Sequence, residues 1–410
     1  MIQFNEKGGD KKQKRKEQKL KKEKVQRNLD YKKVIDSLSR LKPKNLNLAV
    51  LIPVVVLSLF GLMMVYSASS YNAQIYFNNK YHYATKQLIG FILGIVVLAV
   101  AYRIDYRLYK RYAWWILGLG IIVLLLVFVP GIGIDRLGAK RWIGVGGFSI
   151  QPSEIAKFCF VVFAAAILSK SDFIASKFKT VLVVLGAGGM LCGLILLEPN
   201  LSITLTLGLT MFCMLFLCGA RIKHLLIVMA PVLVLLPVLL IAEPYRIRRL
   251  VAFVDPWATP KAEGFQLIQS LFGLGGGGLF GVGYGNSTQK YMFLPFSESD
   301  FIFSIIGEEF GLIGCLVFIA VLGYLIYSTF KVGINCKDHF GKFLCYGIGV
   351  LIFVQSFINL AVVTGSIPPT GLPLPFISFG GTSLAVFLGA IGVVLNVHKR
   401  NRLENLNNLN

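Results

Sequence analysis

The sequence predicts an all-α polytopic membrane protein with about ten transmembrane helices and a long outer loop between the seventh and eighth of them. Of its 410 residues, 55% are hydrophobic and only 15% are charged, whereas soluble domains carry about a quarter charged residues. The apolar residues gather in runs of roughly 18 to 25, the length of a helix that crosses a ~30 Å hydrocarbon core. Basic residues are also unequally shared between alternate loops. A soluble enzyme, a secreted disulfide scaffold and a disordered chain are therefore excluded.

A strongly basic segment precedes the first apolar run. Residues 1–47 hold 16 of the 42 Lys and Arg residues and six acidic ones. The segment has no apolar core, so we expect neither a signal peptide nor a folded domain. It is typical of a cytosolic tail held near anionic lipid headgroups. A specific protein contact is the alternative, and no nucleic-acid partner is expected.

Residues 48–400 are predicted to form one membrane domain, and residues 401–410 a second cytosolic tail. The ten apolar runs are 48–67, 86–102, 113–131, 153–169, 179–197, 201–218, 222–242, 303–327, 343–363 and 378–397. An even number of spans puts both termini on one side. With the termini in the cytosol, the cytosolic loops hold more Lys and Arg than the outer ones, as the positive-inside rule requires. The sequence therefore predicts a multi-pass protein of the cytoplasmic membrane with both termini cytosolic.

Basic residues on the outer side concentrate in two loops, 132–152 and 243–302. Because their placement runs against the topology rule, it suggests an anionic ligand on the outer face. The loop 243–302 is the longest connection and is rich in aromatic and aliphatic residues. Long loops in compact proteins are usually functional or disordered, and this one has apolar surface to bury. We expect it to fold back onto the membrane face, partly re-entrant.

The segment 138–157 reads GAKRWIGVGGFSIQPSEIAK. Pro152 suits the first turn of a helix, where the carboxylate of Glu154 is favoured by the helix dipole. Lys157 follows one turn deeper on the same face. One interpretation is a helix cap with a local ion pair. The other is a functional cavity, because ionisable groups inside a bilayer are costly. Just outside, the residues that could hold an anionic headgroup are Lys140, Arg141 and Trp142.

Two loop segments have an unusual amino-acid composition. The run 273–285 holds eight glycines in thirteen residues but lacks the Lys-Ser/Thr and the preceding strand of a phosphate loop. A flexible or tightly packed backbone against the membrane surface is the first interpretation, and backbone N–H donation to a pyrophosphate is the second. The segment 364–377 contains four prolines, which predict a rigid connector or, alternatively, a wall of the outer cavity.

Asp300 is the leading candidate for catalysis. It stands at the outer mouth of the eighth predicted span, directly before three apolar residues. Burial there would raise the pKa of its carboxyl group, and nearby Arg or Lys would lower it. This is how a general base is tuned to work near neutral pH. A helix N-cap is the alternative role, and the two are compatible.

Together these segments resemble the signature sequences of the SEDS family, over about residues 48–400 and in the right order. They are GAKRWIGVGGFSIQPSEIAK, RIRRLVAFVDPW, GFQLIQSLFGLGGGGLFGVGYGNSTQK, SDFIFSIIGEEFGLIG and PLPFISFGGTSL. SEDS proteins are ten-span glycosyltransferases that polymerise lipid II into peptidoglycan in division, elongation or sporulation. VDPW, GNS and IGEEFGLIG are more similar to the division and spore-cortex members, FtsW and SpoVE, than to RodA.

The resemblance implies that Asp300 is the essential catalytic residue and that Glu154 and Lys157 line the outer cavity near it. It implies a class B penicillin-binding protein as partner, together with other division or sporulation membrane proteins and a place at the division septum. Two motifs depart from the family pattern: PFSESD stands where PE-x-HTD is usual, so that Phe296 and Glu298 replace a glutamate and a histidine, and EPNLS stands where EPDLG is usual. Both leave the aspartate in place.

The expected reaction is an inverting glycosyl transfer on the outer face. Asp300 would deprotonate the 4-hydroxyl of the acceptor sugar, which attacks the anomeric carbon of the lipid-linked donor. The residues expected to bind the substrate, including its pyrophosphate, are Lys140, Arg141, Trp142, Gln151, Glu154, Lys157, Arg246, Arg248 and Arg249. A divalent cation such as Mg²⁺ or Mn²⁺ bridging pyrophosphate and Glu154 is left open, because the sequence has no dedicated cage. A flippase for the lipid-linked precursor and a non-catalytic scaffold that activates a partner synthase are the alternatives.

Overall fold

The computed structural model describes residues 46–136, 139–145, 148–170, 177–241 and 244–407. The chain divides into two units, residues 1–47 and 48–410. Nearly all of the predicted basic tail lies outside the described residues.

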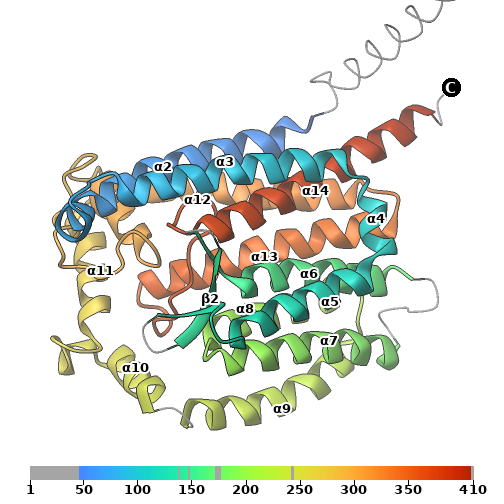
Figure 1. Ribbon diagram of the computed structural model, residues 1–410, viewed down its shortest axis with the longest axis horizontal. Helices are drawn as coiled ribbons and strands as arrows, with labels where there is room; N and C mark the ends of the chain where they lie inside the picture. The colour runs from blue at the N-terminus through green and yellow to red at the C-terminus, as the bar shows by residue number, and fades with distance from the viewer. Residues whose placement is uncertain (1–45, 137–138, 146–147, 171–176, 242–243, 408–410) are drawn as a thin grey trace, which may run out of the picture. The chain divides into compact units, whose positions relative to one another are not determined.

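The second unit is a bundle of long helices, as predicted (Figure 1). Its long helices are α2 (Leu48–Phe77), α3 (His82–Arg103), α5 (Ala113–Leu125), α6 (Pro152–Leu168), α7 (Phe178–Leu197), α8 (Leu201–Leu217), α9 (Ile222–Ile241), α12 (Ile302–Ile334), α13 (His339–Val363) and α14 (Gly381–Asn407). Each predicted span corresponds to one of these helices. A short helix, α4 (Tyr106–Arg111), connects α3 to α5, and a 3₁₀ turn, η2 (Leu126–Phe128), ends α5.

Six of the helices in the described part of the chain are long and apolar enough to cross a membrane, namely α2, α3, α7, α12, α13 and α14. Two shorter apolar helices cover 113–128 and 201–217. The polytopic helical class is therefore confirmed, and the number of ten crossings stays a prediction.

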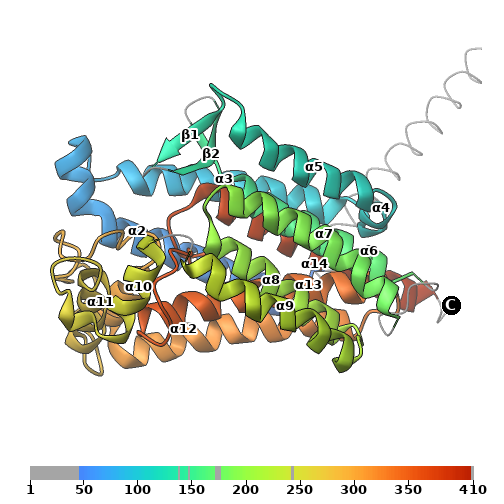
Figure 2. The same cartoon turned by 90° about the horizontal axis from the view of Figure 1, so that it is seen from below.

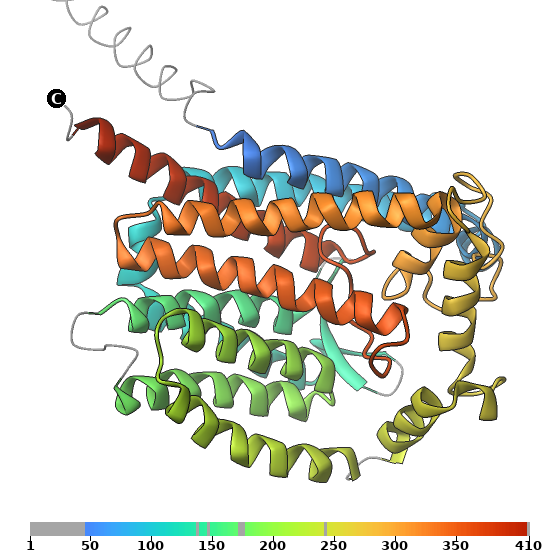
Figure 3. The same ribbon diagram turned by 180° about the vertical axis from the view of Figure 1, so that it is seen from behind.

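Helices α6 and α13 form the centre of the bundle. α13 contacts α6, α8, α12 and α14, while α5 and α7 pack on α6 from the other side. In Figure 3, α12 and α13 run side by side along the bundle. Almost every side chain of α6 is buried, including the small residues Ala164, Ala165 and Ala166. Small residues let helix backbones approach closely, which is how helices pack where lipid supplies no hydrophobic driving force.

Several helices are longer than the apolar runs that predict them. α2 continues to Phe77 through a polar stretch, α12 continues to Ile334, and residues 401–407 of the predicted tail extend α14. Hydropathy marks the part of a helix that lipid favours, whereas intrahelical hydrogen bonds continue as long as no residue breaks the helix.

A small antiparallel sheet between α5 and α6 was not predicted. It consists of β1 (Gly133–Arg136), β2 (Ala139–Val145) and β3 (Phe148–Ile150) in the order β1-β2-β3. In its register Ile134 lies opposite Trp142, and Ile143 lies opposite Ile150. The sheet leads directly into α6 and so fixes where that helix begins.

The long connection before α12 is folded, as predicted. It contains α10 (Pro244–Val254), a 3₁₀ turn η3 (Pro256–Ala258) and α11 (Phe265–Gly276), and α11 packs on α12 and α13. Figures 1 and 2 show these helices gathered at one end of the bundle, where α2 ends and α12 begins. We call this the loop end.

The glycine run packs against a break in α12. Gly311 has φ 67° and ψ −168°, which interrupts the helix. The freed backbone groups are used by the glycine run: the N–H of Val282 donates to Glu308 O at 2.9 Å, and that of Leu312 to Gly278 O at 2.9 Å. A Cβ atom on Gly277 would lie 2.0 Å from Gly307 O. Of the two backbone states considered, flexible and tightly packed, the structure shows the tightly packed one, and its partner is α12.

Candidate active site

Asp300 lies at the end of the irregular segment 277–301, immediately before α12, and is half-buried. Its Oδ1 atom accepts a hydrogen bond from Ser299 Oγ at 2.9 Å. The N-cap residue of α12 is Phe301, and the helix has no side-chain cap bond. The capping role considered for Asp300 is therefore wrong, because the first helical residue is Ile302 and the residue before it is Phe301.

The backbone around Asp300 is fixed by partners from two distant segments. Asn359 Nδ2, on α13, donates to Asp300 O at 2.7 Å. Ser378 Oγ donates to Ser299 O at 2.5 Å, and the N–H of Phe379 donates to Glu298 O at 2.9 Å. A carboxylate held in this way is oriented before any substrate arrives, which lowers the entropic cost of reaction.

Burial raises the pKa of the Asp300 carboxyl group to about 6. The nearby Glu298 carboxyl raises it further, while the Ser299 hydrogen bond and the positive charge of Arg249 lower it. Burial also raises the pKa of Glu298. A carboxylate with a pKa near 6 is ionised at neutral pH and still basic enough to accept a hydroxyl proton in a transition state.

Glu154 and Lys157 form a fully buried ion pair on α6. Lys157 Nζ lies 2.7 Å from Glu154 Oε1 and donates to Gln355 Oε1 at 2.5 Å. Ser383 Oγ, on α14, donates to Glu154 Oε2 at 3.0 Å. The local ion pair considered from the sequence is confirmed, and it ties together three helices of the bundle.

One face of α13 brings the ion pair and Asp300 together. Gln355 and Asn359 are four residues apart on that face. Gln355 Nε2 donates to Pro373 O at 2.9 Å, and Asn359 Nδ2 donates to Leu372 O at 2.7 Å. The proline-rich segment 364–377 therefore lies along the site. Neither amide was among the predicted site residues, although two amides one turn apart in an apolar span are a signal that the sequence does carry.

Gly371 places this segment in van der Waals contact with Asp300. Gly371 has φ +73°, and a Cβ atom there would lie 3.7 Å from Asp300 Oδ2. The geometry supports the proline-rich segment as a wall beside the aspartate.

Arg141 holds the turn between α7 and α8. Its Nε donates to Glu198 O at 3.1 Å, and its Nη2 donates to Pro199 O at 2.6 Å. Ser202 Oγ, at the start of α8, donates to Thr370 O, next to the wall beside Asp300. Arg141 thus positions the backbone near the site. On the same strand β2, Lys140 is exposed and Trp142 is half-buried.

Glu198, the first residue of EPNLS, is buried beside Arg141. Within the described residues, neither of its carboxylate oxygens has a hydrogen-bond partner. Burial raises the pKa of Glu198 to about 8, and the charge of Arg141 opposes that shift. Glu198 was not among the predicted site residues, and its motif stood out only as a departure from the family pattern.

The remaining candidates are placed differently from one another. The positive charge of Arg249 lowers the pKa of Asp300. Arg248 instead forms an exposed ion pair with Glu263 at 3.0 Å. The backbone N–H of Gln151 donates to Thr382 Oγ1 at 3.3 Å, at the beginning of α14. The side chain of Arg246 lies outside the described residues.

The comparisons with known proteins identify the family. The family model of the FtsW, RodA and SpoVE cell cycle proteins matches residues 48–403. This chain belongs to the FtsW/RodA/SpoVE family. It is 41% identical over 377 residues to a probable peptidoglycan glycosyltransferase FtsW of Geobacter metallireducens, covering 91% of this chain and 98% of the relative. It is 38% identical over 356 residues to stage V sporulation protein E of Bacillus subtilis, covering 87% of this chain and 97% of that relative.

Solved structures of the FtsW/RodA/SpoVE fold agree with this assignment. One chain, from a peptidoglycan synthase complex described as coordinating polymerisation and crosslinking, matches with a TM-score of 0.72 and 26% identity, covering 87% of this chain and 98% of that one. The rod shape determining protein RodA of Thermus thermophilus matches with a TM-score of 0.65 and 25% identity, covering 87% of this chain and 97% of that one.

The residues of this FtsW-family site do not fit a resident divalent cation. Across the described ranges, no three side chains of His, Cys, Asp or Glu lie close enough to hold a metal ion. Both oxygens of Glu154 are engaged, one by Lys157 and the other by Ser383. Each carboxylate oxygen of Glu154 thus already has a protein partner.

Proposed function

We propose that the protein is a peptidoglycan glycosyltransferase that polymerises lipid II into β-1,4 glycan strands on the outer face of the cytoplasmic membrane. The observation that carries the proposal is Asp300, a preoriented carboxylate whose pKa is raised to about 6. The chain belongs to a family in which similar relatives are named probable peptidoglycan glycosyltransferases.

Asp300 would act as the general base. Its carboxylate accepts the proton of the acceptor sugar's 4-hydroxyl as the oxygen attacks the anomeric carbon of the donor. The new bond is β-1,4, the bond from that carbon to the pyrophosphate breaks, and undecaprenyl pyrophosphate leaves. General base catalysis of this kind contributes about 10²–10⁴-fold to the rate.

Positive charges around the site would stabilise the leaving pyrophosphate. The positive charge of Arg249 acts on Asp300, and the guanidinium of Arg141 lies against the adjoining 198–200 turn. Preorganised cations aimed at developing charge are usually the largest single contribution to catalysis. Lys140 and Trp142, on the strand before α6, are proposed to contact the headgroup. Lys157 contributes a buried positive charge. It is bound to Gln355, which lies one turn of α13 from Asn359, the residue that holds the backbone of Asp300.

The proposed setting follows from the loop end and the relatives. The loop end faces outward, and both chain termini are cytosolic, because this orientation satisfies the positive-inside rule. The partner is a class B penicillin-binding protein that crosslinks the strands, since a similar chain belongs to a peptidoglycan synthase complex. The process served is division at the septum or spore-cortex synthesis, since the family model is that of cell cycle proteins and one relative is a sporulation protein.

The test is a gel of products from labelled lipid II, with the purified protein and its cognate transpeptidase. The wild type should give a glycan ladder that Asp300→Asn abolishes, because the amide cannot accept the proton. Asp135→Asn is the matched control, since Asp135 is exposed on strand β1. Full activity of Asp300→Asn would contradict the base assignment. Lipid II translocation into liposomes without polymer would favour a flippase.

A further inference from the structure

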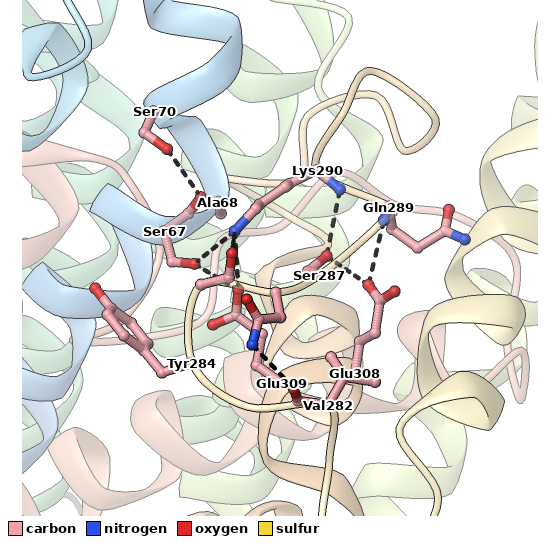
Figure 4. Close-up of polar contacts among 12 residues, drawn as sticks. Ser67, Ala68, Ser70, Val282, Tyr284, Ser287, Gln289, Lys290, Glu308 and Glu309 are labelled. Atoms are coloured by element: carbon pink, nitrogen blue, oxygen red, sulfur yellow. Dashed lines mark hydrogen bonds and ion pairs between the residues drawn. The ribbon is translucent and has the colours of Figure 1, made fainter.

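A second polar cluster joins α2, α12 and the segment 285–290, which precedes Asp300 in the chain (Figure 4). Its members are side chains or backbone groups of Ser67, Gly285, Ser287, Thr288, Gln289, Lys290, Glu308 and Glu309. Two adjacent glutamates of α12 bind it, each to a different part of the segment.

Glu308 binds the backbone of the segment. Its carboxylate accepts hydrogen bonds from the N–H groups of Thr288 at 2.8 Å and Gln289 at 3.3 Å. It also accepts from the hydroxyl groups of Ser287 and Thr288. These bonds join residues 287–289 to residue 308, so they close a loop of the chain that contains Asp300.

Glu309 binds the side chain of Lys290. Lys290 Nζ lies 3.4 Å from Glu309 Oε1, and the two side chains are 5% and 0% exposed. Ser67 Oγ, on α2, donates to the same carboxylate oxygen at 2.5 Å. Lys290 Nζ also donates to Gly285 O. The pair therefore connects the closed loop to α2 as well as to α12.

Helix α2 makes a second hydrogen bond with the same segment, at a residue closer in sequence to Asp300. Ser297 Oγ donates to Ala68 O at 3.2 Å, one residue along α2 from Ser67. Between Lys290 and Ser297 the chain has no regular structure. The segment that carries Asp300 is thus clamped to one short stretch of α2 at two points, seven residues apart in sequence.

Stability alone is a poor reason for this ion pair. Burying two charges costs several kcal/mol per ion, and the mutual attraction often does no more than offset that cost. Within the described residues, Glu309 Oε2 has no hydrogen-bond partner, so the pair is not optimised for burial. In some proteins, buried ionic groups that add little stability are retained because they impose one geometry.

We propose that Lys290 and Glu309, linked to α2 through Ser67, are positioning residues that hold the closed loop 287–308 and thereby set the place of Asp300. The proposal rests on the proposed function, because it takes Asp300 as the general base. A misplacement of about 1 Å in a reacting group can cost on the order of 10²-fold in rate.

The competing interpretation is direct substrate binding by Lys290. Lys290 lines a groove of about 300 Å³ with Tyr66, Tyr71, Gln74 and Tyr291. A binding role and a positioning role differ in kinetics. Loss of a ground-state contact raises KM, whereas loss of an interaction that orients the base lowers kcat.

The experiment measures lipid II polymerisation by Lys290→Met, Glu309→Gln and the double variant in the full-length protein with its transpeptidase. Lys80→Met is the matched control, because Lys80 lines the same groove but is exposed and stacks over Tyr81. We expect kcat to fall by on the order of 10²-fold in each single variant with KM little changed. The double variant should lose no more than either single variant, since the residues act as one unit.

The pH profile separates positioning from a loss of folded protein. A loosened loop lets water reach Asp300, so the acid limb of kcat/KM should move below its wild-type position near pH 6. The charged groups facing Asp300, Glu298 and Arg249, are unchanged in these variants. A protein that is merely unstable would show a lower kcat/KM at every pH, with the acid limb at its wild-type position.

Three outcomes would overturn the positioning role: wild-type kcat in Lys290→Met, a rise in KM with kcat unchanged, or a fall in activity with an unmoved acid limb. Asp300→Asn, measured in parallel, keeps this result separate from the proposed function. Loss of activity in Asp300→Asn together with an unaffected Lys290→Met would refute the positioning role alone.

Discussion

The pKa of a single carboxyl group, Asp300, sets an expected pH dependence. Burial raises this pKa to about 6, and only the ionised form can accept a proton. The value of kcat/KM for lipid II polymerisation should therefore rise about tenfold per pH unit below pH 6 and level off above it. An aspartate with an ordinary pKa near 3.8 would give a flat profile between pH 5 and 7. Initial rates in buffers of constant ionic strength across this range decide between the two.

Which residues form the site was partly predictable. Asp300, Glu154 and Lys157 stood out because charges near or inside apolar spans are costly. Their partners did not stand out: Asn359 lies 59 residues from Asp300 in sequence, and Gln355 lies 198 residues from Lys157. No local pattern encodes such pairs, since helix packing decides which amide meets which charge.

Removing one partner of the buried pair on α6 should destabilise the protein. Lys157→Met leaves the Glu154 carboxylate without its cation inside the bundle, which costs about 3–5 kcal/mol. Lys157→Met combined with Glu154→Gln removes both charges, so it should recover much of that loss. Unfolding in mixed micelles, followed by circular dichroism, measures both variants. Equal losses in the single and double variants would show that the site depends on shape and not on charge.

The break in α12 gives a second prediction for the helices. Gly281 has φ +81°, and a Cβ atom there would lie 2.2 Å from Glu309 O. Gly281→Ala should therefore cost about 1–3 kcal/mol, because strained backbone and a clash with α12 add together. Gly276→Ala is the control: position 276 ends helix α11, and a Cβ atom there meets nothing within 4 Å. Thermal midpoints of both variants in one detergent test this, and a loss in Gly276→Ala of equal size would contradict it.

The sequence predicted the type of most elements correctly, but not where they begin and end. Apolar runs located every long helix, but α2 continues to Phe77 through polar residues that hydropathy does not count as part of a span, because its intrahelical hydrogen bonds continue there. The sheet β1–β3 was missed because its strands are three to seven residues long, too short for alternation to stand out. For the glycine run the sequence left a flexible and a tightly packed backbone open, and only the structure shows that it packs against the break at Gly311.

For the whole molecule, orientation in the membrane decides whether the proposed chemistry has access to its substrate. Helix α12 is interrupted at Gly311, and its continuous part, residues 312–334, is about 35 Å long at 1.5 Å per residue, which still exceeds a ~30 Å hydrocarbon core. Positions before and after it should therefore lie on opposite sides of the membrane. Lys261 precedes α12 at the loop end, and Lys337 follows it; both are exposed.

Cysteine labelling in intact cells tests this orientation. A membrane-impermeant maleimide should label Lys261→Cys in intact cells and Lys337→Cys only after permeabilisation, because the basic loops stay in the cytosol. The unmodified protein is the control, since its seven thiols are buried or half-buried. Labelling of both variants in intact cells would mean that α12 does not cross. The reverse pattern would place Asp300 in the cytosol, away from an outward-facing lipid-linked donor, and the proposed outer-face polymerisation would then be wrong even if the purified enzyme forms glycan.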